Sequence, residues 1–89
     1  MVNQINTAIY EDIAFSFLDD NHRNFNKLAD GLLEEAYEVT EAESKNEKLN
    51  ELSDLLWYVT VMAKQEGTSL KQLMLKNIVK LEDRKLNGK

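Results

Sequence analysis

Two pairs of acidic residues share one spacing in this chain. Glu35 is followed three residues later by Glu38, and Glu51 is followed three residues later by Asp54. Residues three apart on an α-helix lie on the same face, so each pair would place two carboxylates side by side. Twelve residues separate Glu38 from Glu51, enough to end one helix, turn and begin an antiparallel one. The sequence therefore predicts that four carboxylates meet between two neighbouring helices.

The acids fall on apolar helix faces rather than on solvated ones. On a helix that turns about 100° per residue, the positions within about 60° of Glu35 are Leu28, Gly31, Leu32, Glu38, Val39 and Ala42. The same construction around Glu51 gives Asp54, Leu55, Tyr58 and Met62. Carboxylates gathered at low dielectric repel one another and need protons or cations between them. A hard divalent cation suits an all-carboxylate set, so we expect Glu35, Glu38, Glu51 and Asp54 to bind Mg²⁺ or Mn²⁺.

The segments around these acids resemble the MazG-type branch of the all-α nucleoside triphosphate pyrophosphohydrolases. The matching blocks are Leu33-Glu34-Glu35-Ala36-x-Glu38-Val39, Glu51-Leu52-Ser53-Asp54-Leu55-Leu56-Trp57-Tyr58 and Asn77-Ile78-x-Lys80-Leu81-x-x-Arg84. The resemblance implies Mg²⁺-dependent hydrolysis of a nucleoside triphosphate to the monophosphate and pyrophosphate, in the house-cleaning of nucleotide pools. Bound ions would neutralise the triphosphate and activate a water. Glu35, Glu38 or the neighbouring Glu34 would accept the proton of that water.

Four residues are candidates for contact with the substrate. Asn77 lies in the apolar stripe of the last predicted helix, where it either bonds to a neighbouring helix or contacts a phosphate or sugar. Lys80 and Arg84 flank that stripe and are either solvated or bind phosphate. The resemblance favours substrate contact for all three. Tyr58 shares the face of the second acidic pair and is the fourth candidate.

Three further residues have an ordinary structural interpretation beside a functional one. Gly31 lies mid-helix, where glycine costs roughly 1 kcal/mol against alanine. Close approach of another helix or of a ligand phosphate would explain it, and chance is the alternative. We expect His22 to be a surface turn residue rather than a catalytic group. Trp57 lies away from the carboxylates, and we expect it to pack in the core or an interface rather than on a base.

Composition predicts one small all-α domain over residues 1–89. The chain has no proline, no cysteine and three glycines, a pattern typical of helical proteins outside oxidising compartments. Its net charge of −5 argues against binding to nucleic acid or anionic membranes. We see no membrane-spanning run, and residues Met1 to Gln4 do not resemble the start of a signal peptide. We therefore expect a cytoplasmic protein.

Hydrophobic periodicity predicts an antiparallel arrangement of four helices. We expect these to span residues 6–19, 22 or 24 to 44, 47–65 with Asn46 as cap, and 70–85 with Thr68 or Ser69 as cap. The third helix is apolar almost all round from Leu55 to Ala63, which is more than three partner helices can cover. We therefore expect oligomerisation through the third helix, giving a homodimer or homotetramer.

Other classes of function remain open at this point. A helical interaction or regulatory protein with an acidic helix hairpin would show no Mg²⁺ dependence. A di-iron carboxylate bundle uses Glu-x-x-His ligands, and neither acidic pair contains histidine. Within the superfamily, hydrolases acting on phosphoribosyl-ATP or on pyrimidine deoxynucleotides are alternatives that a substrate panel would separate.

Overall fold

Each helix of the protein begins where the sequence supplies a capping side chain. The computed structural model describes residues 4–88 and contains, over that range, four α-helices, one 3₁₀-helix and no strand. The elements are α1 (Thr7–Ser16), η1 (Asp20–His22), α2 (Phe25–Glu41), α3 (Lys45–Gln65) and α4 (Leu70–Asn87). The predicted all-α class is confirmed. Residues 1–3 and 89 lie outside the described range. They include both ends of the predicted domain and most of the segment considered as the start of a signal peptide.

The caps explain the boundaries of the two central helices. The first N–H groups of a helix have no partner within it, and a side-chain oxygen just before the helix can accept from them. Asn24 caps α2 and Ser44 caps α3, the latter by accepting from the Glu47 N–H at 3.1 Å. The predictions that Asn46 would cap the third helix and that the second would reach Ser44 are therefore wrong. Ser44 belongs to the turn, so α2 ends at Glu41 and α3 begins at Lys45.

The outer helices differ from prediction at their ends. α1 stops at Ser16 rather than Asp19, because Asp19 turns outward and caps the 3₁₀-helix, accepting from the His22 N–H at 3.0 Å. α4 begins after the predicted cap Ser69 and continues past Lys85 to Asn87. Gly88 ends it with a φ of +70°, a left-handed conformation that suits a glycine after a helix.

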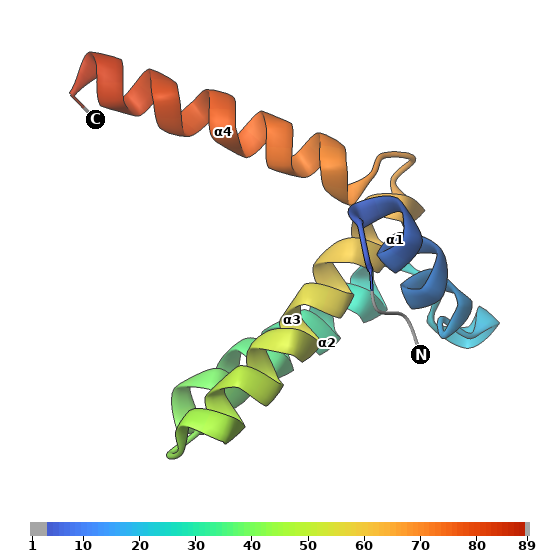
Figure 1. Ribbon diagram of the computed structural model, residues 1–89. Coiled ribbons are helices and arrows are strands. Elements are labelled where there is room, and N and C mark those ends of the chain that lie inside the picture. Colours follow the sequence, from blue (N-terminus) through green and yellow to red (C-terminus); the bar gives the residue numbers. More distant parts are fainter. Residues whose placement is uncertain (1–3, 89) are drawn as a thin grey trace.

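An antiparallel hairpin of α2 and α3 forms the body of the subunit, and α1 crosses the C-terminal half of α3 (Figure 1). The buried core lies where these three helices meet and consists of Ala14, Leu18, Leu28 and Val61. Trp57 packs against this core, and its indole Nε1 donates a hydrogen bond to the Ala14 carbonyl at 3.0 Å. Trp57 therefore packs as expected, away from the acidic face.

The fourth helix projects away from the hairpin (Figure 1). It contacts α1 and α3 near its start, where the Glu11 carboxylate accepts from the Leu70 N–H. The radius of gyration is 14.9 Å, against about 12 Å expected for a compact chain of this length. Within the described chain, α4 projects from the hairpin instead of packing along it, so the predicted antiparallel arrangement of four helices is not confirmed. No helix in residues 4–88 has both the length and the apolar character needed to span a membrane.

Candidate metal centre

Three carboxylates converge between α2 and α3. One oxygen each from Glu35, Glu38 and Glu51 lies within 4.8 Å of the other two. The i, i+3 spacing puts the first two on one face of α2, and the antiparallel packing of α3 brings Glu51 opposite them. Asp54 lies one turn further along α3 and is close enough for its charge to act on Glu35. The structure thus brings together three of the four predicted ligands, with Asp54 beside them.

The innermost oxygens of this cluster lack partners. Glu35 and Glu51 are partly buried, whereas Glu38 and Asp54 are exposed. The Oε2 atoms of both Glu35 and Glu51 are buried and have no hydrogen-bond partner among the described residues. A buried carboxylate oxygen left without a donor is costly. These two atoms are therefore suited to accept a cation between the helices.

The electrostatics of the cluster point the same way. Burial raises the pKa of Glu35 to about 7, and the neighbouring Glu51 carboxyl and the charges of Glu38 and Asp54 add to the shift. The pKa of Glu38 is also raised, chiefly by the neighbouring Glu51 carboxyl and its charge. Full ionisation at neutral pH is therefore unfavourable for the acids alone. An all-oxygen donor set of this charge fits a hard divalent cation such as Mg²⁺ or Mn²⁺.

Tyr58 stands beside the cluster and explains Gly31. A Cβ added at Gly31 would lie 2.6 Å from the Tyr58 hydroxyl oxygen and closer still to the ring. Of the explanations for this mid-helix glycine, the structure selects the close approach of another helix. Burial raises the pKa of Tyr58, and the negative charge of Glu35 adds to the effect. The phenol is therefore held neutral beside the carboxylates.

The sequence profile of the MazG nucleotide pyrophosphohydrolase domain matches residues 23–88. This chain belongs to the MazG family. The match includes the carboxylate hairpin and α4, while α1 lies before it. No curated protein and no solved structure gave a match. MazG membership supports an enzyme of the pyrophosphohydrolase type.

Two adjoining hollows in this MazG subunit are both lined by Tyr58, the residue on which the charge of Glu35 acts. A polar one of about 320 Å³ is lined by His22, Lys27, Asp30, Gly31, Glu34 and Tyr58. A more apolar one of about 210 Å³ is lined by Phe17, Leu18, Asp19, His22, Lys27, Leu28, Trp57 and Tyr58. The two share three residues, so they form one continuous surface, which Tyr58 links to the acid cluster. Glu34, predicted as a catalytic candidate, faces the polar hollow.

Sequence reasoning missed part of this surface. The sequence pattern assigns no role to Lys27 and predicts that His22 is a surface turn residue. His22 is indeed exposed in a 3₁₀-turn, with Nδ1 2.6 Å from an Asp19 carboxylate oxygen, but it also lines both hollows. One signal was available for Lys27, which lies four residues before Gly31 and eight before Glu35. That spacing puts it on the same side of the helix.

The remaining substrate candidates lie elsewhere in the subunit. Asn77, Lys80 and Arg84 are all exposed on α4, which projects away from the hairpin (Figure 1). The burial expected for Asn77 is absent in this subunit, because no element within the described chain covers that face of α4. Their contact with substrate stays a prediction, and one that this subunit alone does not fulfil.

Proposed function

We propose that this MazG protein is a Mg²⁺-dependent nucleoside triphosphate pyrophosphohydrolase, which converts a (d)NTP to the (d)NMP and pyrophosphate. The observation that carries the proposal is the carboxylate cluster. Three acids lie within 4.8 Å of one another, and two of their oxygens are buried without partners. Such a set binds a hard cation readily and has no evident structural purpose without one. A nucleotide triphosphate is the ligand that such cations commonly accompany.

Glu35, Glu38 and Glu51 would hold the cation, with Asp54 available beside them. Bound Mg²⁺ would neutralise the charge of the polyphosphate and would lower the pKa of a bound water. Mn²⁺ would satisfy the same oxygen donors. The charge on the cluster makes ion binding compete with protonation, which is why the raised pKa of Glu35 matters for function.

The neighbouring residues suit a bound nucleotide. Glu34 is exposed on the polar hollow, where it could accept a proton from an attacking water. Lys27 lines the same hollow and offers a positive charge to a phosphate. The apolar hollow next to it is lined by Phe17 and by the edge of Trp57, which also packs against the core, and a hollow of this kind is suited to a base. A house-cleaning role in a cytoplasmic nucleotide pool would follow from this activity.

The test is pyrophosphate release from the eight common NTPs and dNTPs, with Mg²⁺ and with EDTA. We expect release with Mg²⁺ alone, and a loss of at least about 100-fold in Glu38→Gln, because the change removes a ligand charge without changing side-chain shape. Glu43→Gln is the matched control, since Glu43 is an exposed acid in the α2–α3 turn. Release that persists in EDTA, or in Glu38→Gln at the control rate, would contradict the proposal.

A further inference from the structure

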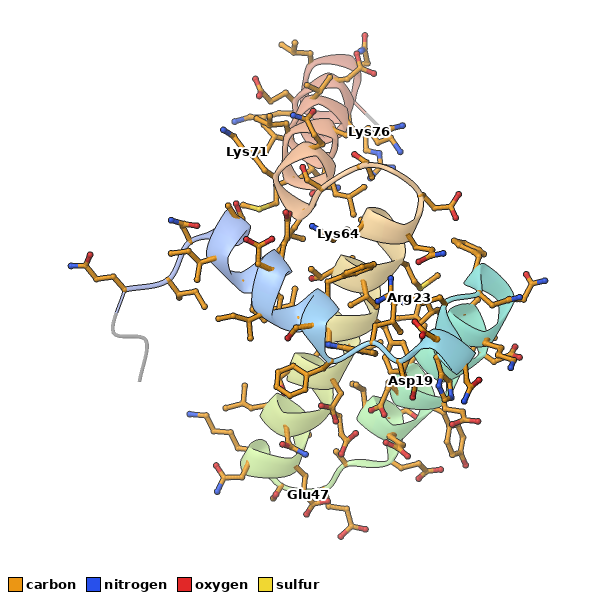
Figure 2. All side chains as sticks on the ribbon, turned by 90° about the vertical axis from the view of Figure 1, so that its right-hand side faces the viewer. Asp19, Arg23, Glu47, Lys64, Lys71 and Lys76 are labelled. Atoms are coloured by element: carbon orange, nitrogen blue, oxygen red, sulfur yellow. The ribbon has the colours of Figure 1, made fainter. Side chains whose placement is uncertain are left out.

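One exposed histidine of this protein is held by two bonds to a single carboxylate. Asp19 caps the 3₁₀-helix η1, in the turn between α1 and α2, and His22 ends that helix (Figure 2). The Asp19 carboxylate accepts from the His22 backbone N–H at 3.0 Å and lies 2.6 Å from Nδ1 of the ring. The two side chains are 61% and 64% exposed. Because exposed ion pairs contribute little to stability, the fixed orientation of this ring points to a ligand.

The turn that carries His22 is tied to the helices on both sides of it. Lys27 of α2 donates through Nζ to the Asn21 carbonyl at 3.1 Å. Arg23, which follows His22, has its guanidinium carbon 4.9 Å from the centre of the Phe15 ring of α1. The imidazole is therefore placed before any ligand arrives. A group placed in advance loses little conformational freedom when it binds.

The pairing with Asp19 decides what the free ring nitrogen of His22 offers. The hydrogen bond from His22 holds the pKa of Asp19 below its usual range, so at neutral pH this carboxylate only accepts. Nδ1 must therefore donate, and Nε2 is the free nitrogen. Nε2 accepts a hydrogen bond when the ring is neutral and donates one when the ring is protonated. A hydroxyl group suits Nε2 in both states, whereas a phosphate oxygen suits only the protonated ring.

The position of His22 also favours a sugar hydroxyl. His22, Lys27 and Tyr58 line both hollows, so the polar and the apolar hollow meet at these residues. The apolar hollow reaches Phe17, which directly follows α1. A nucleotide with its phosphates toward Glu35 and its base in the apolar hollow has its sugar at the junction. The residues that line only the polar hollow precede Glu35 on α2 by five, four and one positions: Asp30, Gly31 and Glu34.

We propose that His22 binds a sugar hydroxyl of the nucleotide through Nε2, and that Asp19 is the positioning residue that orients the ring. The inference rests on the proposed function, because it takes the ligand to be a nucleoside triphosphate, and it adds a determinant of sugar recognition. Both residues precede the segment that the MazG profile matches, residues 23–88. Sugar recognition would then come from the turn before α2 rather than from the carboxylate hairpin.

The test compares three sugars on the same base. A ribonucleotide has the 2′- and 3′-hydroxyls, a 2′-deoxynucleotide has the 3′-hydroxyl, and a 2′,3′-dideoxynucleotide has neither. The probes are triphosphates with a methylene bridge between the α- and β-phosphorus atoms, in these three forms for each of the four bases, titrated with Mg²⁺. Trp57 is the only tryptophan of the chain and lines the apolar hollow, so its fluorescence reports binding.

We expect the wild type to bind the dideoxy form about 5- to 10-fold more weakly than the ribo form, which is the effect of one lost hydrogen bond at an exposed site. The step of the series at which affinity falls identifies the hydroxyl. In His22→Phe, which keeps a ring without a donor or acceptor, the three forms should bind alike. Equal binding of all three forms by the wild type, or the wild-type ratio in His22→Phe, would overturn the role of His22.

The matched control is Asp20→Asn. Asp20 belongs to the same 3₁₀-helix but is not among the residues that line either hollow. This variant should keep the wild-type ratio between the ribo and dideoxy forms. A ratio that falls in Asp20→Asn as far as in His22→Phe would show that any change in the turn abolishes discrimination, and would overturn the specific role of the imidazole.

The role of Asp19 is tested with Asp19→Asn. Asparagine can still cap the turn, but its amide can either accept from Nδ1 or donate to it, so the ring is no longer fixed in one tautomer. We expect a ratio between those of the wild type and His22→Phe, with an unchanged Tm. A wild-type ratio in Asp19→Asn would show that Asp19 caps the turn and does not orient the ring.

The same probes separate this inference from the proposed function. Binding that depends on the sugar and on His22, in a protein that releases no pyrophosphate from natural triphosphates, would overturn the hydrolase function and leave the role of His22 intact. Release of pyrophosphate with no effect of the sugar would do the reverse. If none of the probes binds in the presence of Mg²⁺, both proposals are wrong.

Discussion

Without metal, the protein should lose stability as the pH rises through neutrality. The group responsible is Glu35, whose pKa is raised from an ordinary 4.5 to about 7 in the folded protein. Between these two values the folded state keeps a proton that the unfolded chain releases. Stability is therefore complete below about pH 4.5 and falls as the pH rises to about 7. This dependence of stability on pH is opposite in sign to that of a carboxylate held by a salt bridge, whose contribution is lost as the pH falls.

The size of the effect follows from the shift. From pH 5.5 to pH 8 the folded carboxyl keeps its proton for about 1.5 pH units, a ceiling of about 2 kcal/mol at 1.36 kcal/mol per unit. Glu35 is only partly buried, and solvent screening reduces this to roughly 1 kcal/mol. For a domain of this size, such a loss lowers the Tm by about 4 to 8 °C.

Thermal unfolding followed by circular dichroism in EDTA would measure this. We expect the Tm to fall from pH 5.5 to pH 8 in the wild type and in Glu43→Gln. In Glu35→Gln the fall should be much smaller, because the carboxyl with the pKa of about 7 is gone and Glu38 loses the charged neighbour with which it shared the site. Adding Mg²⁺ should raise the Tm at pH 8 and cancel the slope, since the ion binds the ionised folded cluster. A wild-type Tm that is flat or rising over this range, or an unchanged slope in Glu35→Gln, would refute the electrostatic reasoning.

Three other changes test the surroundings of the site. Gly31→Ala should displace the Tyr58 ring and raise KM several-fold, with a loss of about 1 kcal/mol or less in chemical denaturation because the gain in helix propensity offsets the clash; an unchanged KM would argue against a role for the ring. Trp57→Phe removes the bond to the Ala14 carbonyl and should cost about 1 kcal/mol in urea unfolding, and an equal or higher midpoint would show that this bond does not stabilise α1 on the hairpin. Lys27→Ala should raise KM without changing the Tm. A lower Tm with an unchanged KM would indicate that Lys27 has a structural role instead.

The hairpin and its acids were predictable because local rules and packing agree there. The i, i+3 spacing of Glu35 and Glu38 and the apolar neighbours around them require a partner helix, and the short turn before Ser44 leaves α3 as the nearest one. The helix ends were predicted less accurately. Ser44 and Asn46 are both suitable N-cap residues, and the sequence alone does not decide which of two such neighbours is used. Asp19 likewise could end one helix or cap the next turn.

The position of α4 was not predictable from its own residues. Its apolar stripe of Met74, Ile78 and Leu81 indicates that the helix needs a packing partner. The stripe looks the same whether that partner belongs to the same chain or to another. The decisive features are Gly67 and Glu11, one setting the turn and the other a tertiary bond across 59 residues of sequence. Such a bond has no periodic signature. The hollow shared by His22 and Lys27 escaped prediction for the same reason, since it forms only when a 3₁₀-turn is laid against α2 and α3. In this protein, hydrophobic periodicity predicts which helix faces must be buried. Non-local contacts at the ends of the helices determine which element can bury them.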